Sequence, residues 1–335
     1  MNAPLPLLSV EDLVVRFRAA GIGVPFSGPR YINAVNGVSL AVAPGETLGI
    51  VGESGCGKST LGRAILGLVE AQDGAVQFEG SRVSTRDKTS VARLRSQAAM
   101  IFQDPYGSLN PRVSVGDAIA EVLQVHRKVE AGATAARVAE LLQLVGLSPD
   151  LADRRPHQLS GGQCQRVGIA RALAIEPRLI IADECVAALD VSIQAQILNL
   201  LMQLQRQMNL SLIFISHDLG VVRHLCRRVA VMYLGRIVEL GPTEDVFAAP
   251  RHPYTRALLA AVPDIDPDRA LAPPQLRGEP PSSQDLPAGC PFHPRCPHAQ
   301  EICARGAALA LRPTGQGSVA CHFDLPPNAQ QGEEP

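Results

Sequence analysis

The chain has 335 residues, 46 % of them hydrophobic, and a formal net charge of −1. This length suits one large domain with additions or two modest domains, and the composition can fill a sizeable core. The near-neutral charge argues against nucleic-acid binding, which usually goes with a basic excess. No apolar run reaches the ~18 residues of a membrane-spanning helix, and residues 1–10 lack the pattern of a signal peptide, so we expect a cytoplasmic protein.

Residues 7–241 alternate short apolar runs with helical patterns, which predicts an α/β fold with a mostly parallel sheet. Continuous apolar runs are typical of strands that helices cover on both faces. Four runs have this character: residues 48–51, 179–182, 212–215 and 229–233.

A phosphate loop is predicted directly after the first of these strands. Residues 52–59 fit the pattern G-x-x-x-x-G-K-[ST] and precede a helical pattern. Glycines let the backbone fold closely around phosphates, and the helix N-terminus adds a positive dipole end. A chance glycine-rich turn is the alternative. The expected ligands of ATP are Gly52, Ser54, Gly55, Gly57, Lys58, Ser59 and Thr60, with Lys58 on the β- and γ-phosphates and Ser59 on Mg²⁺.

Two helical regions are predicted further along. Residues 104–159 are rich in Ala, Leu and Val at helical spacing and predict a helical insertion within the α/β core. Between residues 191 and 209 the apolar side chains fall on one helical stripe, formed by Ile193, Ile197, Leu200, Leu201, Leu204 and Met208.

A second loop suited to anions lies at residues 159–163, which read Leu-Ser-Gly-Gly-Gln and precede a predicted helix over 165–175. A serine and two glycines at a helix N-terminus make such a site. If this loop and the phosphate loop face apart, one chain cannot wrap both around one nucleotide. We therefore expect each loop to serve the nucleotide of a partner subunit.

An acidic pair, Asp183 and Glu184, ends the strand at 179–182. An acidic residue at the carboxyl end of a buried parallel strand faces the ligand crevice. Asp183 suits the Mg²⁺ shell and Glu184 suits polarisation of the attacking water. The alternative is a pair that caps a helix.

Taken in chain order, these motifs resemble those of ABC transporter nucleotide-binding domains. The resemblance covers residues 7–241 and includes the phosphate loop, a Q-loop at Gln103, the signature at 159–163, the acidic strand at 179–184, a D-loop at 188–190 and an H-loop at His217. It implies a P-loop NTPase core of the ABC type with a helical signature subdomain. It also implies that ATP and Mg²⁺ bind and that the site is completed by a second subunit.

The resemblance assigns further roles. Gln103 would sense Mg²⁺ or the lytic water and couple to membrane subunits, and His217 would contact the γ-phosphate and hold Glu184 in place. Asp190 would cross the dimer interface. The signature residues expected to bind the partner's ATP are Ser160, Gly161, Gly162 and Gln163.

An aromatic side chain should stack on adenine. Phe17 aligns best with the pattern of the resembled family, and Tyr31 is the alternative. Phe17 could instead be a core residue.

Some residues depart from the family pattern. Residues 185–188 read Cys-Val-Ala-Ala where Pro-Thr-Ser-Ala is common, which leaves the acid and the base in place. Cys164 replaces a frequent arginine after the signature, removing a charge near the interface. Cys56 lies within the phosphate loop, where a reactive thiol of low pKa beside Lys58 is conceivable but not needed.

The chain beyond the core resembles oligopeptide/dipeptide importer ATPases, through residues 251–259, 103–111 and 192–196. The implied organisation is a nucleotide-binding domain at 7–245 (helical subdomain about 104–170), a C-terminal extension at 246–325 with a Pro-rich linker after Val262, and a disordered tail at 326–335. The implied partners are a sister ATPase, two membrane permeases and, indirectly, a substrate-binding protein, at the cytoplasmic face of the membrane. Import of nickel, opines or oligosaccharides is an alternative, as is a soluble ABC ATPase acting on DNA or ribosomes.

Four cysteines cluster in the C-terminal extension: Cys290, Cys296, Cys303 and Cys321, with five, six and seventeen residues between them. Thiolates at this density suit a metal centre in a reducing cytosol. The candidates are a 4Fe–4S cluster, which members of the resembled family carry, or Zn²⁺. His293, His298 and His322 permit a mixed ligand set, and free or conditionally oxidised thiols are the alternative.

Overall fold

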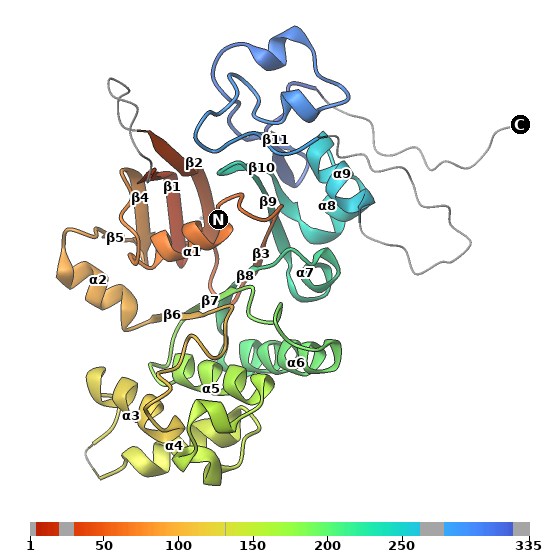
Figure 1. Ribbon diagram of the computed structural model, residues 1–335. Coiled ribbons are helices and arrows are strands. Elements are labelled where there is room, and N and C mark those ends of the chain that lie inside the picture. Colours follow the sequence, from red (N-terminus) through yellow and green to blue (C-terminus); the bar gives the residue numbers. More distant parts are fainter. Residues whose placement is uncertain (1–4, 20–29, 131, 262–277, 324–335) are drawn as a thin grey trace, which may run out of the picture. The chain divides into compact units, whose positions relative to one another are not determined.

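Figure 1 shows the computed structural model of the chain, which describes residues 5–19, 30–130, 132–261 and 278–323. The chain forms two compact units, and each is described by itself. The first unit contains Met1–Leu8, Ala41–Thr47 and Gln77–Ile215, and the second contains Ser9–Leu40, Leu48–Val76 and Ser216–Pro335.

Three parallel strands form the sheet of the first unit, in the order β8-β7-β6. They are β6 (Ala98–Ile101), β7 (Leu179–Asp183) and β8 (Ser211–Ile215). Ile181 of β7 pairs with Met100 on one side and with Ile213 on the other. Every residue of β7 and β8 is buried, which confirms these two strands and the burial that their apolar runs predict.

Helices make up most of the first unit between its strands. They are α3 (Val115–Val125), α4 (Thr134–Leu144), η1 (Pro149–Asp153), η2 (Pro156–Gln158) and α5 (Gly161–Leu173). α3, α4 and α5 contact one another. α5 begins four residues before the predicted start at 165, because the signature itself forms its first turn.

The rest of the first unit comprises β5 (Ser81–Val83), α2 (Lys88–Arg95) and α6 (Val191–Met208). On α6 the predicted stripe is buried at Ile197, Leu200, Leu201 and Leu204. Its ends are not: Ile193 is half-buried and Met208 is 36 % exposed. α6 ends where Asn209 adopts the left-handed conformation, which Asn tolerates well.

The second unit contains most of β1 (Leu8–Arg18), β2 (Tyr31–Val42) and β4 (Asp73–Phe78), hydrogen-bonded in the order β2-β1-β4. The predicted stretch between Phe17 and Tyr31 lies partly outside the described residues.

A second sheet of this unit has the order β11-β12-β10-β9-β3. Its strands are β3 (Thr47–Val51), β9 (Arg228–Tyr233), β10 (Arg236–Pro242), β11 (Arg312–Thr314) and β12 (Gly317–Val319). β3 and β9 are parallel, as predicted, whereas β10, β11 and β12 pair antiparallel. The expectation of a mostly parallel sheet missed this antiparallel part, which short hairpin connections make possible.

The remaining elements of the second unit are α1 (Lys58–Ile65), α7 (Leu219–Leu225), α8 (Thr243–Ala248), α9 (Pro253–Ala260), η3 (His293–Arg295) and η4 (Glu301–Ala304). Residues 278–323, here called the C-terminal segment, contain all four clustered cysteines. Pairing of β12 with β10 ties this segment to the core, through Val319 opposite Glu239. Residues 262–277, which make up most of the predicted Pro-rich linker, and the tail from 326 lie outside the described residues.

Within the described ranges, no helix is both long enough and apolar enough to cross a membrane.

Candidate nucleotide-binding site

The phosphate loop lies between β3 and α1, and its glycines are required by close backbone contacts. A Cβ on Gly57 would lie 2.0 Å from the carbonyl oxygen of Ala34, and one on Gly52 would lie 2.1 Å from that of Met232. Gly57 also has φ of 105°, in the left-handed region, where it caps α1. The loop therefore fits the close backbone cradle that phosphate binding needs, and the residues present suit ATP.

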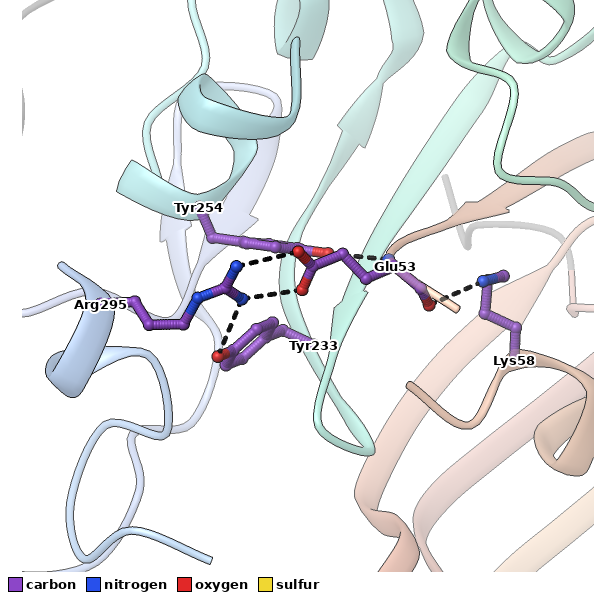
Figure 2. A network of polar contacts seen from close by, with 5 residues as sticks. All are labelled: Glu53, Lys58, Tyr233, Tyr254 and Arg295. Atoms are coloured by element: carbon purple, nitrogen blue, oxygen red, sulfur yellow. Dashed lines mark hydrogen bonds and ion pairs between the residues drawn. The ribbon is translucent and has the colours of Figure 1, made fainter. Parts of the chain in front are cut away.

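Lys58, the lysine of the motif, points back into this loop and is only 4 % exposed. Its ammonium donates to the carbonyl oxygen of Gly52 at 2.8 Å. It also donates to the carbonyl oxygen of Glu53 at 3.0 Å (Figure 2). Ser59 and Thr60 follow in the first turn of α1 and are half-buried. A cation and a helix N-terminus thus face the same loop, an arrangement that attracts anionic oxygens.

Cys56 does not supply a reactive thiolate. Its side chain is 5 % exposed, and burial raises the pKa of its thiol despite the opposing charge of Lys58. The conceivable low-pKa thiol in the phosphate loop is therefore wrong, because desolvation outweighs the neighbouring ammonium.

The acidic pair ends β7 in the first unit. Asp183 is 1 % exposed, and Glu184 follows it with φ of 45° while its backbone N–H donates to the carbonyl of Ile215 at 3.0 Å. The Gln103 side chain donates to Oε2 of Glu184 at 3.1 Å, so the structure brings together the predicted Q-loop residue and the predicted base. Helix capping by this pair is wrong, since Asp190 occupies the N-cap of the next helix.

The signature forms the N-terminus of α5 through a capping box. Oγ of Ser160 accepts from the N–H of Gln163 at 3.3 Å, and Oε1 of Gln163 accepts from the N–H of Ser160 at 2.9 Å. Ser160 is exposed, whereas Gly162 is buried so closely against α6 that a Cβ would lie 2.6 Å from Cγ2 of Ile193. The capping box therefore accounts for Ser160, and the close packing against α6 accounts for Gly162.

Two contacts that the sequence reasoning missed tie the Q-loop segment to the signature helix. The hydroxyl of Tyr106 donates to the carbonyl of Leu159 at 3.1 Å, and the Arg171 guanidinium donates to the carbonyl of Ser108 at 2.7 Å. Burial lowers the pKa of Arg171. Only the placement of Tyr106 and Ser108 close after Gln103 hinted at such a role.

Cys164 is a core residue. It is fully buried, its Sγ lies 3.4 Å from the carbonyl oxygen of Pro156, and burial raises the pKa of its thiol to about 11. An apolar thiol occupies this interior position without an uncompensated charge.

The other predicted site residues are accounted for as follows. His217 and Asp190 are exposed. Phe17 is 40 % and Tyr31 45 % exposed, so Phe17 is not a core residue, and the choice between the two aromatics stays a prediction. The second unit holds the phosphate loop, His217, Phe17 and Tyr31; the first holds Gln103, Asp183, Glu184, Asp190 and the signature.

The four clustered cysteines line one pocket of the second unit, together with His252, Phe292, His293, His298 and His322 among others. None of the eight cysteines, all of which lie in the described residues, forms a disulfide. Burial raises the pKa of Cys290 to about 11, and the three neighbouring thiols add to this. Within the described part of the chain, no three His, Cys, Asp or Glu side chains are arranged to hold a metal ion, so the structure supports neither of the expected centres, the 4Fe–4S cluster or Zn²⁺.

His252 is a lining residue of this pocket that the sequence reasoning did not single out. It is 1 % exposed, and its Nδ1 accepts from the N–H of Tyr254 at 3.0 Å. Burial lowers its pKa to about 3, so its ring is neutral.

The ABC class of P-loop ATPases combines three features that this chain has. A phosphate loop follows one buried parallel strand, an acidic pair ends a second buried strand, and a Ser-Gly-Gly sequence caps the start of a helix. Residues 35–187 match the family model described as ABC transporter, and residues 238–303 match that of the oligopeptide/dipeptide transporter C-terminal region.

Known ATP-binding proteins of peptide transporters are similar in sequence to this chain over most of its length. The oligopeptide transport ATP-binding protein OppF of Escherichia coli (strain K12) is 52 % identical over 94 % of this chain and 95 % of its own length. The di/tripeptide transport ATP-binding protein DppF of Pseudomonas aeruginosa is 46 % identical over 94 % and 97 %. The chain belongs to the family of ABC transporter ATP-binding proteins, in the branch with the oligopeptide/dipeptide C-terminal region, and its enzymatic activity is ATP hydrolysis.

Solved structures agree with this fold. cbiO1 from Clostridium perfringens, part of the ABC transporter complex cbiONQ, has a TM-score of 0.62 and 30 % identity over 72 % of this chain and 91 % of its own. The cassette MJ0796, as a dimer in a post-hydrolysis state with ADP and phosphate, has a TM-score of 0.62 and 27 % identity over 70 % and 98 %.

Proposed function

We propose that the chain energises the import of peptides by hydrolysing ATP for an ABC transporter. The observation that carries this proposal is identity of about half along nearly the whole length of relatives named as oligopeptide and di/tripeptide transport ATP-binding proteins. The match of residues 238–303 to the oligopeptide/dipeptide transporter region supports the same substrate class. Nickel, opines and oligosaccharides remain the outcomes that a transport assay would distinguish.

The residues divide the chemistry among them. Backbone N–H groups of the phosphate loop and the Lys58 ammonium would bind the phosphates. Ser59, Asp183 and Gln103 would hold Mg²⁺, which would supply positive charge to the transferred phosphoryl group. Glu184 orients the attacking water, an assignment supported by the 3.1 Å hydrogen bond that Gln103 donates to it. His217 contacts the γ-phosphate, and Phe17 or Tyr31 stacks on adenine.

A second ATPase subunit completes the site. Ser160, Gly161, Gly162 and Gln163 would bind the nucleotide of the partner, and Asp190 would lie at the subunit boundary. The dimeric state of the related cassette MJ0796 supports this arrangement. The γ-phosphate would make its extra contacts only in the closed dimer, so bound ATP would favour closure. Hydrolysis would remove these contacts, and the dimer would open.

The proposed assembly contains a sister ATPase, two permease subunits and, indirectly, a substrate-binding protein. The chain would attach to it from the cytoplasmic face of the membrane. A soluble ATPase acting on DNA or ribosomes is the competing function, and the near-neutral charge of −1 counts against it.

The test is reconstitution with the permease subunits and the substrate-binding protein of the proposed assembly. Peptide-stimulated ATP hydrolysis and uptake in vesicles are expected, and Glu184→Gln should keep ATP binding while turnover falls about 100-fold or more. Turnover that DNA stimulates and peptide does not would reject the transport function. Substantial hydrolysis by Glu184→Gln would reject only the assignment of Glu184.

We also propose that the cysteine pocket binds a metal centre, with a 4Fe–4S cluster as the first candidate and Zn²⁺ as the second. The four thiols that line one pocket support it, because thiolates are the ligands that both 4Fe–4S clusters and Zn²⁺ take in proteins. Iron, acid-labile sulfide and zinc are to be measured in protein purified without oxygen. Absence of all three would leave four free thiols and end this proposal.

A further inference from the structure

Glu53, the residue after the first glycine of the phosphate loop, is held by the C-terminal segment. Its carboxylate accepts two hydrogen bonds from the Arg295 guanidinium, at 3.0 Å to Oε1 and 2.8 Å to Oε2 (Figure 2). The Arg295 side chain is 5 % exposed and that of Glu53 is 24 % exposed. A two-pronged, largely desolvated ion pair of this kind fixes geometry more strictly than a surface pair.

The backbone of Glu53 is fixed as well. Its N–H donates to the hydroxyl oxygen of Tyr254 at 2.9 Å, and its carbonyl accepts from the Lys58 ammonium at 3.0 Å. One residue therefore connects Arg295 and Tyr254 to the lysine that binds phosphate. Moving Glu53 would move one of the two carbonyl oxygens that accept hydrogen bonds from Lys58.

Arg295 itself has little freedom. It lies in η3, its guanidinium donates to the hydroxyl of Tyr233 at 3.4 Å, and the Glu53 carboxylate raises its pKa. Phe292, fully buried, packs edge-on against Tyr233 at 5.3 Å and against Tyr254 at 5.5 Å between ring centroids. The aromatic cluster seats η3, so the guanidinium is pre-positioned.

We propose that Arg295 is a positioning residue for ATP binding, which acts through Glu53 to hold the phosphate loop and Lys58 in the arrangement that receives phosphate. Arg295 directly precedes Cys296, so a change in the cysteine pocket reaches the loop by the same path. By linkage, ATP affinity depends on the C-terminal segment, and bound ATP steadies that segment in return.

The first test measures the dissociation constant of Mg·ATP for the full-length chain by calorimetry. Arg295→Met should weaken binding by about tenfold, a typical coupling between sites, and Arg295→Lys should recover part of it. Arg305→Met is the matched control, because it removes an ion pair of the same segment whose side chains, Arg305 and Glu301, are 73 % and 83 % exposed. Unchanged affinity in Arg295→Met, or an equal loss in Arg305→Met, would overturn the proposal.

The second test uses Glu53→Gln, which keeps the size of the side chain and serves also if Arg295→Met fails to fold. Saturating Mg·ATP should slow hydrogen exchange at the amides of Gly289 and Cys290, which bond to the carbonyls of Gly306 and Cys303 at 3.0 and 2.8 Å. This protection is expected in the wild type and in Arg305→Met, and should be lost in Glu53→Gln. An ion pair with a purely structural role would leave the protection by ATP intact in Glu53→Gln, and that result would refute the coupling.

Discussion

Replacing Gly162 by alanine adds one methyl group where the signature helix α5 packs on α6. The new Cβ would lie 2.6 Å from Cγ2 of Ile193. Carbon atoms in contact prefer ~3.5–4.0 Å, so the first turns of the two helices would have to separate by about 1 Å. Because Ile193 is β-branched, Cγ2 cannot swing away cheaply.

Two effects oppose each other in the single variant. Overpacking costs ~1–3 kcal/mol, while alanine in place of glycine gains ~1 kcal/mol of helix propensity. The net loss in the free energy of unfolding is therefore only ~0–2 kcal/mol. A double-mutant cycle with Ile193→Ala separates the two, because helix propensity cancels and Cγ2 is gone. The expected coupling energy is ~1–3 kcal/mol, with the double variant more stable than the sum of the single losses predicts.

Urea unfolding of the four proteins, followed by circular dichroism, supplies these values. The control cycle pairs Gly161→Ala with Leu189→Ala, since a Cβ on Gly161 would lie 3.3 Å from Cδ2 at the far end of the flexible Leu189 side chain. Its coupling should stay below ~0.5 kcal/mol. If the Gly162 and Ile193 changes prove additive within the same margin, the close packing of α5 on α6 does not limit this position.

Three further predictions concern the same unit. Ser160→Ala removes the cap of α5 and should cost ~1 kcal/mol of stability, which Ser160→Asn, an equally good cap, should restore; equal losses would reject capping. Tyr106→Phe removes the hydroxyl that donates to the carbonyl of Leu159 at 3.1 Å and should cost ~0.5–1.5 kcal/mol in the same unfolding assay, whereas an unchanged stability would show that this bond contributes nothing net. With the pKa of Cys164 raised to about 11, only about one thiol in a thousand is ionised at a pH of about 8, so iodoacetamide should label it far more slowly in the native protein than in urea; equal rates would contradict its burial.

Local features were predictable because their causes lie close together in the chain. The phosphate loop needs glycines within a few residues of one another. Unbroken apolar runs predict the buried strands at 179–182 and 212–215. The predicted start of α5 at 165 is four residues late, although Ser160 and Gln163 have the residue types and spacing of a capping box. The antiparallel strands of the second unit were missed because three-residue strands such as β11 and β12 carry almost no periodic signal.

The sequence by itself determined the class of ATP-hydrolysing protein. This was possible because phosphate loops, helix caps and buried strands depend on residues that are neighbours in the chain. Only the tertiary structure decided which distant side chains meet. Arg295 and Glu53 are separated by 242 positions, and Tyr106 and Leu159 by 53. No local pattern marks such partners, because an arginine pairs with whichever carboxylate the packed chain brings within reach, and packing depends on contacts along the whole chain.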